Sequence, residues 1–280
     1  MELGEPSPWV DAEDWDGAER GEPPIPAAPP ASLRLATFNV HFGADVEALA
    51  AAIRGNQRLA AAQVIFVQEI ESHPGEGGSR ASRLASALEM GYAYLPSRDE
   101  GDGSHGLAIL STLPLQAVRG MVLPHGELSI RPRPRIAVAA DVDLAGATLR
   151  LVNVHLDTRL NVTDRMQQLR PAVVDSPMPV VAGGDLNTLP YVWADGAVPL
   201  TPLDSVVSTE QAEVIDEFMS ALGFDTPTAG LGATQHSSDL LPELRLDSLY
   251  TRGLVAPAAA VEREVEVSDH WPVWIDVGLP

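Results

Sequence analysis

Four segments of the chain each end an apolar run with side chains that can bind a hard metal ion or carry a proton. These runs end at Asn39, at Glu69, at Asp185 followed by Asn187, and at Asp269 followed by His270, and a fifth run ends at His155. A buried strand with such an ending places oxygen ligands or a general base at one edge of a sheet. The pattern predicts a metal-dependent hydrolase.

Seven short motifs, taken in order along the chain, resemble the endonuclease/exonuclease/phosphatase family of metal-dependent phosphoesterases. They are Thr37-Phe-Asn39, Val67-Gln-Glu69, Gly106-Leu-Ala-Ile-Leu-Ser111, Asn153-Val-His155, Gly183-Gly-Asp185-Leu-Asn187, Arg245-Leu-Asp247 and Ser268-Asp269-His270. The resemblance covers about residues 33–277, and the Gly-Asp-x-Asn and Ser-Asp-His motifs are its most specific parts. It implies a DNase-I-like α/β fold, a four-layer sandwich of two mixed β-sheets flanked by helices, and hydrolysis of phosphoesters.

Asn39 and Glu69 suit a hard cation such as Mg²⁺ or Mn²⁺, which prefers oxygen ligands and keeps several of its waters. Considered alone, Asn39 could merely end a strand and Glu69 could be a surface acid, but the other motifs argue against this. The resemblance implies that the matching residues bind the metal, and that Asp269 also lies near it.

Asp185 and Asn187 lie on one side of an extended segment, because side chains two residues apart point the same way. An aspartate there can orient and deprotonate the attacking water, and the asparagine amide can donate to a phosphate oxygen of the substrate. Gly183 and Gly184 would let backbone and substrate approach closely. The alternative is an Asx-type turn, which leaves the other motifs unexplained.

His270 and Asp247 are expected to form a dyad, since a carboxylate fixes the tautomer of an imidazole and raises its basicity. The resemblance supports this pairing, and implies that His270 binds or protonates the phosphoryl group. His155 would be a second imidazole that contacts a non-bridging oxygen of the substrate or assists the leaving group. A structural histidine is the alternative for His155.

Arg135 is a candidate substrate contact at the end of the segment Arg131-Pro-Arg-Pro-Arg135, because a guanidinium binds phosphate through two hydrogen bonds. An arginine held by surface acids is the alternative. Arg165 and Gln168 resemble an Arg-x-x-Gln pair of the family, and this arginine could be structural. His41 stands where abasic-site endonucleases of the family usually carry aspartate, which argues against a role in DNA repair.

The spacing of apolar residues predicts alternating helices and strands after residue 32. Helices are expected at residues 46–62, 80–90, 163–174 and 209–222, and a turn at Ala145-Gly146 predicts a hairpin. Strands are expected near 33–39, 64–68, 92–95, 106–110, 136–142, 149–154, 180–183, 246–251 and 271–277. Hairpins combined with βα units indicate two packed sheets with helices outside. The motifs come from both ends of this region, which favours one catalytic domain over residues 32–280.

Residues 1–31 contain eight acids, one arginine and seven prolines, without hydrophobic periodicity. This composition predicts a disordered, acidic, proline-rich tail whose partner is unknown. Trp9 and Trp15 are exceptions, which could form a short docking motif or fold back onto the domain.

The net charge is −21, and all 18 basic residues are arginine. Such a chain repels polyanions at long range, which argues against tight, non-specific binding to duplex DNA but not against phosphoester chemistry. Cysteine is absent, which excludes disulfides, a thiolate nucleophile and a cysteine-based zinc site. No membrane-spanning run or signal peptide is recognisable, so the expectation is a cytoplasmic monomer.

The predicted function is hydrolysis of a phosphoester, in nucleic acid or in a small phosphodiester, by in-line attack of water. A nuclease-like phosphodiesterase is favoured over a phosphomonoesterase acting on a small, lipid or sugar phosphate. A binding protein that keeps this fold without turnover is the alternative from another class. The sequence contains no Gly-x-Ser-x-Gly, P-loop or His-Glu-x-x-His motif that would indicate an unrelated hydrolase.

Overall fold

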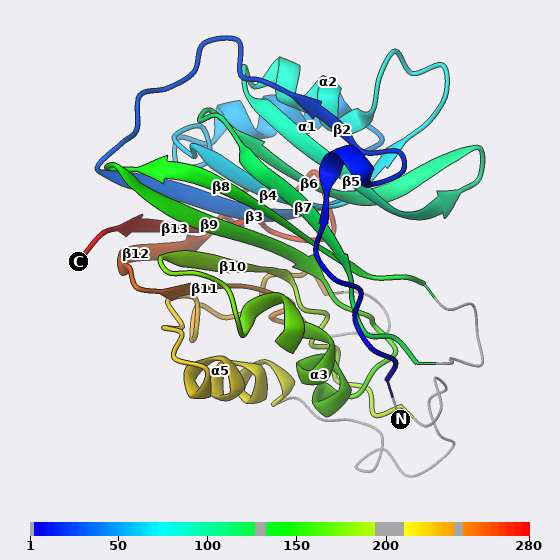
Figure 1. The fold of residues 1–280 in the computed structure, drawn as a ribbon, viewed down its shortest axis with the longest axis vertical. Helices are drawn as coiled ribbons and strands as arrows, with labels where there is room; N and C mark the ends of the chain where they lie inside the picture. Colours follow the sequence, from blue (N-terminus) through cyan, green and yellow to red (C-terminus); the bar gives the residue numbers. More distant parts are fainter. Residues whose placement is uncertain (1–2, 127–132, 194–209, 238–242) are drawn as a thin grey trace.

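A computed structural model describes residues 3–126, 133–193, 210–237 and 243–280. Two mixed β-sheets pack face to face, and helices cover their outer faces (Figure 1). The described strands form a sheet of six in the order β1-β7-β8-β9-β10-β11 and a sheet of seven in the order β12-β13-β3-β4-β6-β5-β2. The predicted four-layer sandwich is confirmed.

The first sheet contains β1 (Val10–Asp11), β7 (Gln116–Val122), β8 (Ile136–Leu144), β9 (Ala147–His155), β10 (Val180–Asp185) and β11 (Asp247–Arg252). The second contains β12 (Val255–Val261), β13 (Val273–Gly278), β3 (Ser32–Phe42), β4 (Val64–Ser72), β6 (Gly103–Ser111), β5 (Gly91–Glu100) and β2 (Glu19–Gly21). The helices of the described residues are η1 (Ala12–Asp14), α1 (Val46–Gly55), α2 (Arg80–Ala87), α3 (Val162–Val173) and α5 (Gln211–Ala221). No helix in the described part of the chain has the length and apolarity needed to cross a membrane.

The central strands are apolar on both faces because each face is covered. In β3, Leu33 and Leu35 point into the core between the sheets, whereas Ala36 and Phe38 pack under α1 and α2. A third cluster lies between the first sheet and the helices α3 and α5. Successive side chains of a strand point to opposite faces, so this sandwich buries nearly continuous apolar runs.

The helix α1 ends at Gly55, earlier than the predicted end at residue 62. The side chain of Asn56 accepts hydrogen bonds from the backbone N–H groups of Arg58 and Leu59, and Asn56 itself has an extended backbone. An asparagine side chain that bonds the backbone ahead of it competes with the helix. The apolar spacing continues past this point, so periodicity alone placed the end too late.

The expectation of a disordered tail is corrected for the described part of residues 1–31. Strand β1 pairs with β7, and β2 pairs with β5, so this arm extends one edge of each sheet (Figure 1). Between them, the indole of Trp15 donates a hydrogen bond to the carbonyl of Pro96 (3.0 Å). A Cβ at Gly120 would lie 2.5 Å from this indole ring. The edge strands β7 and β5 offer unpaired backbone groups to the arm. The amino-acid composition of the arm does not reveal that such partners exist.

Candidate active site

Three of the predicted site residues lie on neighbouring strands of the first sheet. Asp185 ends β10, and its partners in the strand register are His155 at the end of β9 and Asp247 at the start of β11. Directly opposed residues on adjacent strands lie about 5 Å apart. Strand order therefore brings together three residues that are distant in sequence.

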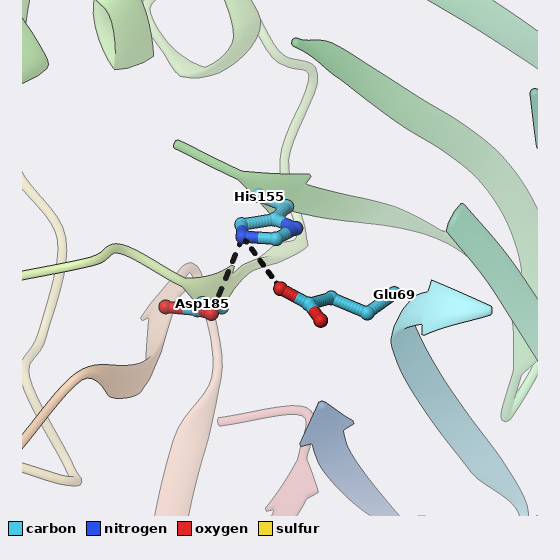
Figure 2. A group of neighbouring side chains, drawn as sticks. All are labelled: Glu69, His155 and Asp185. Atoms are coloured by element: carbon cyan, nitrogen blue, oxygen red, sulfur yellow. Dashed lines mark ion pairs between the residues drawn. The ribbon is translucent and has the colours of Figure 1, made fainter. Parts of the chain in front are cut away.

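Glu69 reaches this group from the second sheet through an irregularity in β4. The pairing of β4 with β3 and with β6 shifts register near this residue, and Glu69 has a φ of 58°. Figure 2 shows its carboxylate pointing toward His155 and Asp185. The His155 Nε2 lies 3.8 Å from Glu69 Oε1 and 3.4 Å from Asp185 Oδ2. A bulge that re-aims one side chain is a common device next to active sites.

Asp185 is buried and accepts hydrogen bonds at both carboxylate oxygens. The side-chain amide of Asn39 donates to Oδ2, and the backbone N–H of Asn187 donates to Oδ1, each over 2.9 Å. Burial, followed by repulsion from Asp247, raises the pKa of Asp185 to about 7, against the opposing effect of His270 and of these hydrogen bonds. Asp185 can therefore exchange a proton near neutral pH.

His270 forms the expected pair with Asp247. The distance between His270 Nδ1 and Asp247 Oδ2 is 2.8 Å, and the hydroxyl of Thr234 donates to the same oxygen over 2.7 Å. Burial alone would lower the pKa of His270, but the charge and hydrogen bond of Asp247 raise it to about 10. Its imidazole is thus positively charged at neutral pH. Sequence analysis missed Thr234, because nothing marks one threonine before a proposed motif.

His155 is neutral, since burial and then the nearby Arg135 hold its pKa well below the usual value. Both of its ring nitrogens are buried and lack a hydrogen-bond partner among the described residues. Within a site of acids, such a ring is free to bond a substrate oxygen.

Asn187 has a φ of 49°, and its amide donates to the carbonyl of Leu156 (2.9 Å). The bond from its backbone N–H to Asp185 closes the Asx-type turn that sequence analysis considered as an alternative. Turn and site coincide here, because the turn holds both side chains at the end of β10.

Arg135 is buried, and its Nε has no hydrogen-bond partner in the described part of the chain. Burial lowers the pKa of its guanidinium, and the carboxylates of Asp157, Glu69 and Asp185 oppose this shift. Arg135 therefore lies within electrostatic reach of the acids, as a substrate contact must. Arg131 of the same segment lies outside the described residues.

Two groups of described side chains are close enough to hold a metal ion, namely Glu69, His155 and Asp185, and Asp185, Asp247 and His270. Asn39 adjoins both through its bond to Asp185. Neither group includes Asp269, whose half-exposed carboxylate instead lies 3.4 Å from His41 Nδ1. The acids Glu69 and Asp185 with the amide of Asn39 fit the oxygen preference of Mg²⁺ or Mn²⁺.

A buried polar bridge, missed by sequence analysis, joins the two sheets beneath the site. The amide of Gln68 donates to Asn153 Oδ1 (2.7 Å) and to the hydroxyl of Thr37 (3.0 Å). Asn153 Nδ2 donates in turn to the carbonyls of Val67 (3.1 Å) and Ala108 (2.9 Å). Gln68 precedes Glu69, and Asn153 lies two residues before His155. Polar residues inside apolar strands were the available signal.

Gly183 and Gly184, the two glycines before Asp185, allow the neighbouring strands to pack closely. A Cβ at Gly184 would lie 2.1 Å from the carbonyl oxygen of Val154, and one at Gly183 would lie 2.1 Å from that of Ser248. The expected close approach exists, but its partners are the neighbouring strands β9 and β11.

Arg165 and Gln168 shape the segment that follows His155. Arg165 donates to the backbone carbonyls of Asp157 (3.0 Å) and Thr158 (3.1 Å). The Oε1 of Gln168 accepts from the backbone N–H of Asp157 over 2.8 Å. Both side chains bond backbone groups, which favours the structural interpretation of this pair.

Residues 36–270 match the model of the Endonuclease/Exonuclease/phosphatase family. No curated protein matches the chain in a sequence comparison. Among solved structures, an endonuclease/exonuclease/phosphatase from Beutenbergia cavernae has a TM-score of 0.66 at 22% identity, covering 89% of this chain and 72% of that one. A family protein from Leptotrichia buccalis has a TM-score of 0.63 at 17% identity, covering 87% and 98%. D. rerio TDP2, solved with a single-strand DNA product, has a TM-score of 0.57 at 16% identity, covering 88% and 99%.

Proposed function

The chain belongs to the endonuclease/exonuclease/phosphatase family, and on this premise we propose that it is a divalent-metal-dependent phosphodiesterase. The observation that carries the proposal is the position of Asp185. This buried acid, with a pKa of about 7, stands between the carboxylate of Glu69 and the charged imidazole of His270. A proton acceptor beside a fixed positive charge suits attack of water on phosphorus.

Glu69 and Asn39 would hold Mg²⁺ or Mn²⁺, and we propose Asp269 at the rim as a further ligand. When bound, the cation would stabilise the negative charge on the phosphoryl oxygens. The carboxylates of Glu69 and Asp185 lie within reach of one another, and a cation would relieve their repulsion.

Asp185 accepts a proton from the attacking water as the water oxygen bonds to phosphorus. The bond from phosphorus to the leaving oxygen breaks in line, and the leaving oxygen takes a proton from solvent. His270, held by Asp247, donates a hydrogen bond to one phosphoryl oxygen, and His155 or the Asn187 amide donates to another. Arg135 supplies a further positive charge. Catalysis is then mostly positioning and electrostatic stabilisation.

A phosphomonoesterase acting on a small, lipid or sugar phosphate is the alternative activity, and a catalytically silent binding protein is the alternative class. Silent relatives of enzymes are expected to have lost ligands and bases, yet this chain keeps the whole set. The single-strand DNA product of D. rerio TDP2 supports nucleic acid as the first substrate class to test. The acidic surface favours short substrates over long duplex DNA.

Titration with Mg²⁺ and Mn²⁺, with EDTA as control, tests the proposal on bis-p-nitrophenyl phosphate, p-nitrophenyl phosphate and plasmid DNA. Asp185→Asn should reduce kcat by about a thousandfold, within the usual range for loss of a general base. The exposed Asp175 provides the matched control Asp175→Asn, which should retain activity. Near-normal turnover by a correctly folded Asp185→Asn variant would remove Asp185 from the reaction.

A further inference from the structure

A pocket of about 340 Å³ lies beside the candidate active site. Phe42, Arg98 and Arg133 line it, together with an ion pair between Arg80 and Glu71. Its volume falls at the lower end of the range for small-ligand sites. The proposed reaction uses none of these five side chains.

The side chain of His105 separates the pocket from Arg135 and His155 of the candidate active site. Arg98 Nη1 lies 3.0 Å from Nδ1 of His105, and His105, Arg135 and His155 line one small cavity of about 10 Å³. Arg133 lies two residues before Arg135, and Phe42 lies three residues after Asn39. A group bound in the pocket would therefore adjoin a phosphate held at the active site.

Phe42 presents an aromatic ring at the pocket wall. Phe42 is 38% exposed, which is unusual for phenylalanine, and its backbone φ is 71°. A bulky residue rarely adopts a positive φ, and such strain is commonly found at functional sites. The ring centroid lies 4.6 Å from that of His41 and 6.3 Å from that of His105. These contacts hold an exposed flat surface, of the kind on which a nucleobase stacks.

Arg133 carries the available positive charge of the pocket. It is exposed, and it has no hydrogen bond or ion pair with any described residue. Arg80, by contrast, is matched by Glu71 and Glu76 over 2.7 and 2.8 Å, and Arg98 is shared between Glu100 and His105. In a chain of net charge −21, a free arginine beside a phosphate-processing site points to an anionic group on the substrate.

We propose that this pocket binds the nucleotide next to the scissile phosphodiester, with its base on Phe42 and its outer phosphate on Arg133. The inference rests on the proposed phosphodiesterase function and narrows its substrate class to short or single-stranded nucleic acid. A sugar phosphate or lipid phosphate offers no flat ring for Phe42. In a duplex the faces of the bases are stacked and inaccessible, whereas unstacked bases of single strands bind aromatic side chains.

Hydrolysis of thymidine dinucleotides tests the inference directly. The substrates are TpT, the 5′-phosphorylated pTpT and the 3′-phosphorylated TpTp, with bis-p-nitrophenyl phosphate as a diester that has aromatic rings but neither a nucleobase nor an outer phosphate. One phosphorylated dinucleotide should exceed TpT in kcat/KM by about tenfold, corresponding to one charge-assisted contact. Arg133→Ala should abolish this ratio. Arg170→Ala, which removes another exposed arginine, on α3, should preserve it.

Phe42→Ala should lower kcat/KM for all three dinucleotides by about tenfold, as expected for one stacked base, and Phe42→Tyr should restore it. Calorimetric binding of thymidine 3′,5′-bisphosphate in EDTA gives a readout without turnover, and its Kd should rise about tenfold in Arg133→Ala. Equal Kd values in wild type, Arg133→Ala and Arg170→Ala would overturn the inference. Wild type that binds the bisphosphate but hydrolyses no diester would overturn the proposed function instead.

Discussion

Replacement of Asn153 by alanine should destabilise the protein by removing the bridge between the two sheets. Asn153 is fully buried, and its side chain takes part in three hydrogen bonds, with Gln68, Val67 and Ala108. A buried hydrogen bond contributes about 1 kcal/mol net, so the free energy of unfolding should fall by about 3 kcal/mol. This is a large fraction of the 5–15 kcal/mol or so typical of a domain.

Urea unfolding followed by tryptophan fluorescence measures this loss. The matched control is Asn161→Ala, which removes two hydrogen bonds to the backbone of Trp193 (2.9 and 2.8 Å) in a partly exposed loop. Water can replace those bonds, so the control should lose about 1 kcal/mol or less. Activity of folded Asn153→Ala should also fall, because the bridge sets the separation of Glu69 and His155.

Asn153→Asp separates hydrogen bonding from volume. Aspartate keeps the shape of asparagine, but at neutral pH it turns an acceptor toward the carbonyls of Val67 and Ala108. The aspartate variant should therefore be at least as unstable as the alanine variant. An Asn153→Asp variant as stable as wild type would refute the reasoning, since volume alone would then account for the effect of alanine.

Three further perturbations test separate parts of the structure. Burial, followed by the charge of Arg98, lowers the pKa of His105 to about 2, so only the unfolded chain takes up this proton below about pH 6.5. The free energy of unfolding should thus decrease as the pH is lowered from 7 to 5, and His105→Gln should reduce this decrease by about 2 kcal/mol, measured by urea unfolding at each pH. An unchanged pH dependence in His105→Gln would show that His105 is not buried as a neutral imidazole. Glu69→Ala should raise the metal concentration for half-maximal activity, and an unaltered requirement in a metal titration would place the cation elsewhere. Trp15→Ala should cost about 2 kcal/mol of unfolding free energy, below the range for a fully buried tryptophan, while specific activity of the folded protein stays within a few-fold; full stability would show that the arm does not pack in solution.

Much of the architecture was predictable because it is local. The hairpin between β8 and β9 follows from a turn at Ala145-Gly146, and α2 and α3 follow from apolar spacing. The arm at the N-terminus was not predictable in this way. Its composition is typical of disorder, but its two short strands gain partners only when the sheet edges β7 and β5 exist.

The candidate site divides along the same line. The sequence by itself determined which polar residues end apolar strands, because the local pattern of apolar and polar residues marks strand ends. It therefore predicted that four of these residues would meet at one edge, namely Asn39, Glu69, His155 and Asp185. Only the tertiary structure decided that Asp185 lies between His155 and Asp247, that a bulge aims Glu69 across the sheets, and that Asp269 faces His41 instead. Strand order, backbone irregularity and burial are collective properties of the folded chain. They set the pKa of Asp185 and His270, and no spacing of residues encodes them locally.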